Sequence, residues 1–161
     1  MKLISFGKKF ENLSLSIDHQ VLGSEFRTFS NKIILGDKVV LVCASQMWGI
    51  AEVSSCVEYD AAPIWKDKLY PYRAKIQKIK VFECPISFSE SGIDQIFRKR
   101  LGIQWAYKVL FTPGELPAEA IECLEILFAT VRFLDDSSYR TYLSENVKKF
   151  EVARRIRLGL N

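Results

Sequence analysis

Metal-binding and membrane-spanning features are scarce in this chain of 161 residues. It has a single histidine, His19, and its four cysteines form no Cys-x-x-Cys pair, which argues against a zinc site. No apolar run approaches the length of a membrane span, so no membrane partner is expected. The N-terminus is too short and too soon charged for a signal peptide. Since each cysteine sits among apolar residues, we expect reduced, buried thiols in a cytoplasmic protein.

Motifs for cofactors and for catalysis are missing as well. The sequence contains neither GxGxxG nor GxxxxGKS/T, which argues against nucleotide cofactors and NTP hydrolysis. No serine or cysteine has the surroundings of a nucleophile, and one histidine leaves few possible triads. We therefore predict a protein that is not an enzyme and uses neither cofactor nor metal. A carboxylate pair assembled by folding would escape this search.

An excess of positive charge is absent from the first 147 residues, where 18 basic and 18 acidic residues balance. The whole net charge of +4 lies after them, where five basic residues accompany one glutamate. These basic residues are Lys148, Lys149, Arg154, Arg155 and Arg157. Such a tail can hold a phosphate backbone, or it can be merely solvated.

Hydrophobic periodicity predicts a mixture of strands and helices. Strands are expected at residues 3–6, 38–44, 50–57, 73–82 and 105–111. Helices are expected at residues 10–19, 93–101, from 117 onward, and once or twice in 139–158. Residues 46–49 are expected to form a tight connection. This order lacks a strict βαβ rhythm, which favours an α+β fold with a small curled or closed sheet.

Residues 64–80 form the most informative stretch. Trp65 and Tyr70 stand among Lys66, Lys68 and Arg73 in a loop that leads directly into a strand. Farther along, the apolar alternation slips by one at residue 78, which predicts a bulge. Aromatic faces beside cations suit a nucleobase and its phosphates. Alternatively, the rings brace a barrel and the lysines form a solvated face.

Three segments in order resemble the EVE domain family of the PUA-like superfamily. They are LGDKVV at residues 35–40, GIAEV at 49–53 and YPYRAKI at 70–76. The resemblance implies a PUA-like mixed β-barrel of five or six strands flanked by helices, spanning residues 1–129. It also implies a reader of modified bases without catalytic activity, related to the YTH domains that read methylated adenine. The helical, basic extension at residues 130–161 has no counterpart in the family.

Site residues follow from this resemblance together with the aromatic loop. Family members often carry tryptophan where this chain has Leu22, so either Trp48 or Trp65 substitutes as a pocket wall, or the pocket is altered or lost. The predicted base-binding residues are Leu22, Ser24, Ser45, Trp48, Trp65, Tyr70 and Arg73. The predicted phosphate-binding residues are Lys66, Lys68, Lys148, Lys149, Arg154 and Arg155. Trp105, in an apolar run, is expected to lie in the core.

Three functions remain open at this point. The first is binding of nucleic acid, RNA or DNA, through a modified base in an aromatic-lined pocket. The second is protein interaction or assembly, in which the barrel is a scaffold and the C-terminal helices form a homo-oligomer. The third is binding of a small ligand in the same pocket. The sequence does not distinguish DNA from RNA, or one base modification from another.

Overall fold

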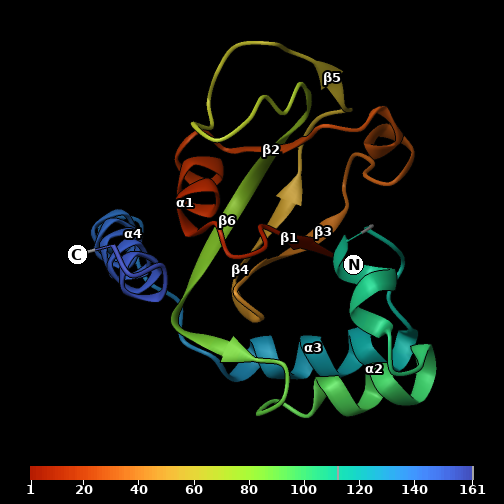
Figure 1. Cartoon of the computed structure of the whole chain (residues 1–161). Helices are drawn as coiled ribbons and strands as arrows, with labels where there is room; N and C mark the ends of the chain where they lie inside the picture. Colours follow the sequence, from red (N-terminus) through yellow and green to blue (C-terminus); the bar gives the residue numbers. More distant parts are fainter. Residues whose placement is uncertain (112, 161) are drawn as a thin grey trace.

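The computed structural model describes residues 1–111 and 113–160 and has a mixed α+β fold built on one curled sheet (Figure 1). The strands are β1 (Lys2–Ser5), β2 (Val21–Ser24), β3 (Lys38–Cys43), β4 (Gln46–Val53), β5 (Glu58–Tyr59) and β6 (Tyr72–Ser87). The helices are α1 (Phe10–Asp18), η1 (Arg27–Asn31), α2 (Ile93–Leu101), η2 (Tyr107–Phe111), α3 (Ala118–Thr130) and α4 (Ser138–Arg157). The predicted fold class is confirmed: an α+β fold with a curled, barrel-like sheet of five or six strands, flanking helices and a helical C-terminus. The sheet has six strands and forms a half-barrel.

The strand order is β1-β3-β4-β6-β2, with β5 beside β6. β1 runs parallel to β3, and the other paired strands are antiparallel. β3 and β4 are joined by a two-residue turn in which Ala44 and Ser45 both have positive φ, 51° and 62°. Positive φ at both turn residues is the conformation that two-residue hairpin turns prefer, although here neither residue is the glycine that usually marks such a turn. The predicted connection at residues 46–49 is therefore wrong, because those residues begin β4.

β6 is the longest strand and curls the sheet. Its first part pairs with β2 and β5, and the rest pairs with β4. Lys78 has a φ of 50°. Gln77 pairs with Glu52 and Lys80 pairs with Ile50, so three residues of β6 span the distance that two residues of β4 span. One extra residue on β6 is a β-bulge, so the predicted slip at this position is confirmed.

The sheet has a hydrophobic core on each face. Alternate residues of β3 point to opposite cores, so the continuously apolar strand is buried on both sides. Val39, Leu41 and Cys43 face the core beneath α1 and α4. Val40 and Val42 face the core covered by α2, η2 and α3. The two helical layers therefore lie on different sides of the sheet, as Figure 1 shows.

The segment expected to form a strand at 105–111 is helical, and its last five residues form the π-helix η2. Trp105 and Val109 are both buried, and this spacing of four residues is helical. Trp105 lies in the core as predicted, where its ring packs on Phe97 with centroids 4.7 Å apart. Its Nε1–H donates to Asp94 Oδ1 at 2.7 Å. The apolar run was misinterpreted because a short run fits a strand and a buried helix equally well.

The C-terminal residues form one long helix, α4, whose first half packs on the sheet. Leu143 is fully buried, and the Phe150 ring stacks on Phe10 of α1 with centroids 4.8 Å apart. From residue 151 onward the described residues are exposed. The domain boundary at residue 129 stays a prediction. Within residues 1–111 and 113–160, no helix is long and apolar enough to cross a membrane.

Candidate functional site

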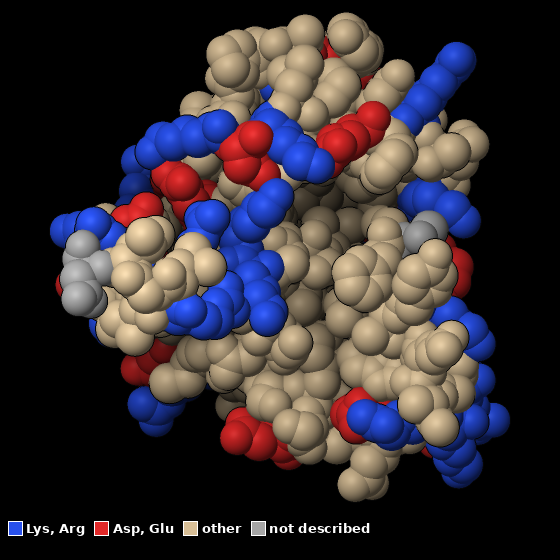
Figure 2. All heavy atoms as spheres, in the orientation of Figure 1, with Lys and Arg blue, Asp and Glu red and all other residues tan. Residues whose placement is uncertain are grey.

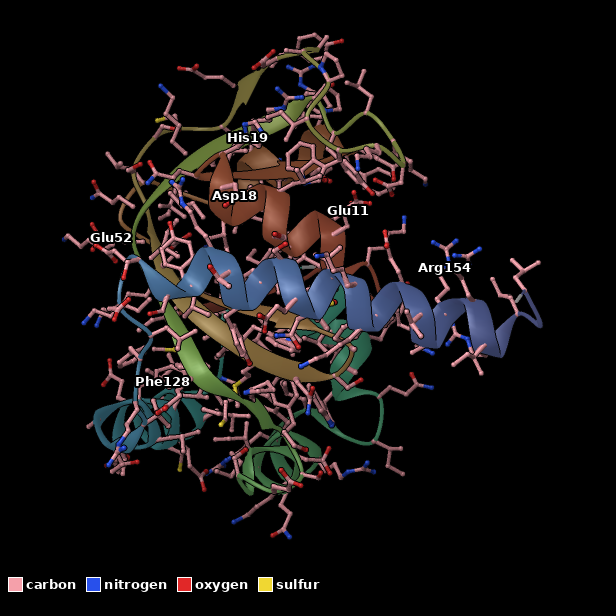
Figure 3. The ribbon with its side chains drawn as sticks, turned by 90° about the vertical axis from the view of Figure 1, so that its left-hand side faces the viewer. Glu11, Asp18, His19, Glu52, Phe128 and Arg154 are labelled. Atoms are coloured by element: carbon pink, nitrogen blue, oxygen red, sulfur yellow. The ribbon has the colours of Figure 1, made fainter. Side chains whose placement is uncertain are left out.

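A groove of about 760 Å³ lies between the start of α1 and the second half of α4. Its polar walls are formed by Lys8, Lys9, Glu11, Asn12, Asp67, Glu151, Arg154 and Arg157. Its apolar lining includes Phe10, Ala44, Val147, Phe150 and Ala153. Figure 2 shows this face of the molecule, with Lys and Arg side chains gathered beside α4. In Figure 3, α1 and α4 run side by side, with Glu11 and Arg154 on the segments that border the groove.

Aromatic rings make the floor of the groove rigid. Phe10 and Phe150 are stacked with an interplanar angle of 10°. Trp48 lies beneath them, edge-on to Phe10 at 4.5 Å, and is 2% exposed. Its Nε1–H donates to the carbonyl of Cys43 at 3.0 Å, which satisfies the only polar atom of the ring. Trp48 therefore supports the groove from below.

Asp67 is the centre of a hydrogen-bond network at the end of the groove. Its Oδ2 accepts from Lys9 Nζ at 2.6 Å and from the Tyr70 hydroxyl at 2.8 Å, and its Oδ1 accepts from Asn12 Nδ2 at 3.0 Å. Burial opposes ionisation of Asp67, but these donors outweigh it and lower its pKa to about 2. The hydrogen bond with Asp67 also raises the pKa of Lys9. The network thus holds a carboxylate and an ammonium at the groove wall.

Trp65 lies directly behind this network and is 6% exposed, the same fraction as Trp105. Its Nε1–H is shared between Ser16 Oγ at 3.2 Å and the Asn12 carbonyl at 3.3 Å. The Tyr70 ring meets it edge-on at 5.1 Å. A Cβ at Gly23 would come within 2.4 Å of the indole, so β2 needs glycine at this point. Trp65 therefore packs as tightly as a core residue.

Arg73 fastens the loop that carries Trp65. Its guanidinium donates to Asp60 Oδ2 at 2.8 Å, to the Tyr70 carbonyl at 3.0 Å and to the Ala62 carbonyl. The guanidinium also lies over the Trp65 ring, 5.4 Å from its centroid. Arg73 is 5% exposed, and its hydrogen bonds hold the loop of residues 60–70 in place.

The other predicted base-binding residues lie in two places. Leu22 is buried in the core beneath α1. Ser24 ends β2 opposite Tyr72, where its Oγ accepts from the Phe26 amide at 3.1 Å. Ser45 is exposed on the β3–β4 turn, next to the Ala44 that lines the groove. The structure thus gathers Trp65, Tyr70, Arg73 and Leu22 near β2, while Ser45 and Trp48 belong to the β3–β4 hairpin.

The predicted phosphate-binding residues also divide into two groups. On the loop, Lys66 pairs with Glu11 at 2.6 Å and Lys68 pairs with Glu25 at 2.9 Å. On α4, Arg154 lines the groove, whereas Lys148, Lys149 and Arg155 are exposed outside its lining.

Several residues of the groove were not predicted. The polar ones are Lys8, Lys9, Glu11, Asn12, Asp67 and Glu151, whereas Arg157 was named only as part of the basic tail. Asn12 and Asp67 form part of no motif, and 55 residues separate them in the chain. The one available signal was a polar Asn12 beside the apolar stripe of the first helix, which is a weak indication of a buried polar contact.

The fold is similar to that of the YTH domain of the MRB1 protein from Zygosaccharomyces rouxii, solved in complex with N6-methyladenosine RNA. The two structures align with a TM-score of 0.54 and 19% sequence identity, over 83% of this chain and 90% of that chain. No protein-family model and no curated protein matches the sequence. The chain therefore shares its fold with a domain that binds RNA.

Proposed function

We propose that this chain is a non-enzymatic nucleic-acid-binding domain, of the EVE type, that receives a modified base at the groove between α1 and α4. One observation carries the proposal: the groove joins the network around Asp67, with Trp65 behind it, to the arginines of α4. The partly buried ring of Phe150 and the hydrogen-bonding groups of the groove suit a base, and arginines without a direct ion pair suit phosphates. The RNA complex of the structural neighbour supports the same class of ligand.

The groove residues form two sets, one suited to a base and the other to the phosphate backbone of the ligand. Asn12 and Asp67 offer an amide and a carboxylate at one end of the groove, so they can exchange their present partners for the edge of a base. Arg154 and Arg157 stand on the opposite wall, where they can neutralise phosphates.

The test is a binding screen with labelled single-stranded RNA and DNA that carry one modified base, including N6-methyladenine, or its unmodified parent. Fluorescence anisotropy is measured between about 50 and 200 mM salt, because phosphate contacts make affinity salt-dependent. We expect binding to every strand and a preference for one modified base. Binding without preference would reduce the proposal to a general nucleic-acid binder, and an absence of binding would overturn it.

Assembly is a second candidate function, favoured by the exposed end of α4. Val152, Ile156, Leu158 and Leu160 are each more than half exposed there, among basic residues. Apolar side chains at such spacing can pack on a second copy of the helix. Mass measurement in solution distinguishes this candidate: a dimer that dissociates on Ile156→Glu supports assembly, and a monomer at high concentration excludes it.

A further inference from the structure

A second aromatic surface lies on η2, outside the groove. Tyr107 and Phe111 are 71% and 74% exposed, and Ile103 in the preceding turn is 85% exposed. The two rings are four residues apart in sequence, and their centroids are 6.0 Å apart. Because Trp105 and Val109 are buried, this segment fixes one side in the core and presents the two rings to solvent. The result is a pair of rings held on a packed element.

The segment that carries these rings is strongly basic. Four basic residues and no acidic residue lie in residues 95–111: Arg98, Lys99, Arg100 and Lys108. Arg98 and Arg100 pair with Asp94 and Glu119. Lys108, directly after Tyr107, donates to the Leu101 carbonyl at 2.6 Å, which holds its ammonium at the end of α2. With Arg98 and Arg100 paired, Lys99 and Lys108 are the cations that can attract an anionic partner with planar apolar groups to this surface.

η2 and the groove border the same face of the molecule. η2 packs against β1, and the chain leaves β1 to reach Lys8 and Lys9 at the groove. In Figure 2 a hollow on this face lies between the basic side chains beside α4 and the opposite side of the face, where Figure 1 shows the chain around α2 and η2. A single strand that occupies the groove can therefore continue across this face toward the two rings.

We propose that Tyr107 and Phe111 form a stacking platform for an unpaired base of the same strand whose modified base and phosphates occupy the groove. This rests on the proposed function and extends it by naming a second contact and a single-stranded ligand. Stacking on exposed aromatic rings tolerates any base, and it strengthens binding roughly fivefold to 150-fold for each base. A symmetric contact between two copies through this surface would bring the same cations together, which opposes self-association.

The experiment measures the affinity of the full chain for single strands of about five and about twelve nucleotides that share one central modified base. Tyr107→Ala/Phe111→Ala is the test variant. Phe26→Ala is the matched control, because Phe26 is also an exposed aromatic residue, 69% exposed, outside η2. We expect the test variant to bind the long strand at least fivefold more weakly and the short strand as wild type does. Tyr107→Phe retains the ring and should retain wild-type binding.

Equal losses on both strands, or no loss on either, would overturn the platform. A change of mass in solution on Tyr107→Ala/Phe111→Ala would also overturn it, because the occupant would then be a protein. Wild-type protein that binds neither strand would overturn the proposed function itself, so the two failures are distinguishable. If the double variant does not fold, Tyr107→Ala and Phe111→Ala are measured singly by the same criteria.

Discussion

The basic residues of the loop after β5 and those at the end of α4 stand near the same groove but differ in their partners. Lys66 and Lys68 of the loop each have a glutamate within 2.9 Å. Within the part of the chain that the structure describes, Arg154 and Arg157 of α4 have no ion-pair partner. A phosphate that approaches the loop must displace a carboxylate from its lysine, whereas one that approaches Arg154 or Arg157 displaces no direct ion pair, although Glu11 and Glu151 also line the groove. The two groups, equivalent in sequence, are therefore unequal candidates for phosphate binding.

A second difference concerns how each segment is held. Residues 60–70 are fixed by buried contacts of Trp65 and Arg73, whereas α4 beyond residue 151 is exposed. Arginines in the last turn also stabilise a helix through its dipole, which would explain Arg154 and Arg157 without a ligand. Four variants, taken from the largest expected effect to the smallest, distinguish these accounts.

Trp65→Ala should lower the free energy of unfolding by about 3–5 kcal/mol, as truncation of a buried aromatic residue does. The ring is 6% exposed, and its removal leaves Gly23 and Tyr70 without their packing partner. Denaturant unfolding measures the loss, and Trp105→Ala, equally buried, is the matched control. Wild-type stability in Trp65→Ala would mean that the loop is not anchored through this ring.

Arg154→Gln/Arg157→Gln should flatten the dependence of log affinity on log salt by about 0.9 for each phosphate that the variant no longer neutralises. The expected preference for a modified base should survive, because phosphate contacts and base contacts act separately. Lys66→Gln/Lys68→Gln is the control and should leave the slope unchanged. If the loop variant changed the slope and the α4 variant did not, the loop lysines would be the phosphate-binding residues and the α4 arginines would not.

Asp67→Asn should lower stability at neutral pH by about 1–2 kcal/mol, after discounting for partial exposure. The pKa of Asp67 is lowered from 3.8 to about 2 in the folded protein, so its stabilisation is complete above pH 4 and is lost as the pH falls through 2. The difference between wild type and variant should shrink over that interval. Asp136→Asn, at an exposed aspartate, is the control. A difference that is constant with pH would exclude the charge of Asp67 as its cause.

Lys66→Gln should have the smallest effect, within about 1 kcal/mol of wild-type stability, because exposed ion pairs contribute little. Lys66 is 77% exposed in its pair with Glu11. Thermal unfolding of Lys66→Gln, Glu11→Gln and the double variant gives the coupling energy of the pair. A coupling well above 1 kcal/mol would show that the loop depends on this pair as well as on Trp65.

Local features of the fold were predictable because they are encoded in neighbouring residues. The bulge at Lys78 was visible as a slip in alternation, and Gly102 ends α2 as expected, with a φ of 85°. The turn at Ala44 and Ser45 was missed because neither residue carries the usual signal for positive φ. The basic tail seen in the sequence supplies two arginines that line the groove, Arg154 and Arg157, but nothing in the sequence indicated Asn12 or Asp67 as their neighbours.

The sequence by itself determined the alternation of strands and helices, the α+β class and the concentration of charge at the C-terminus, since each depends on spacing or composition alone. Tertiary structure decided which charges are neutralised and which side chains share a groove. Asn12, Asp67 and Arg154 meet because α1, the loop and α4 pack together, and segments so distant in the chain carry no local signal of one another. The same packing made Trp65 a buried support and left Tyr107 and Phe111 exposed.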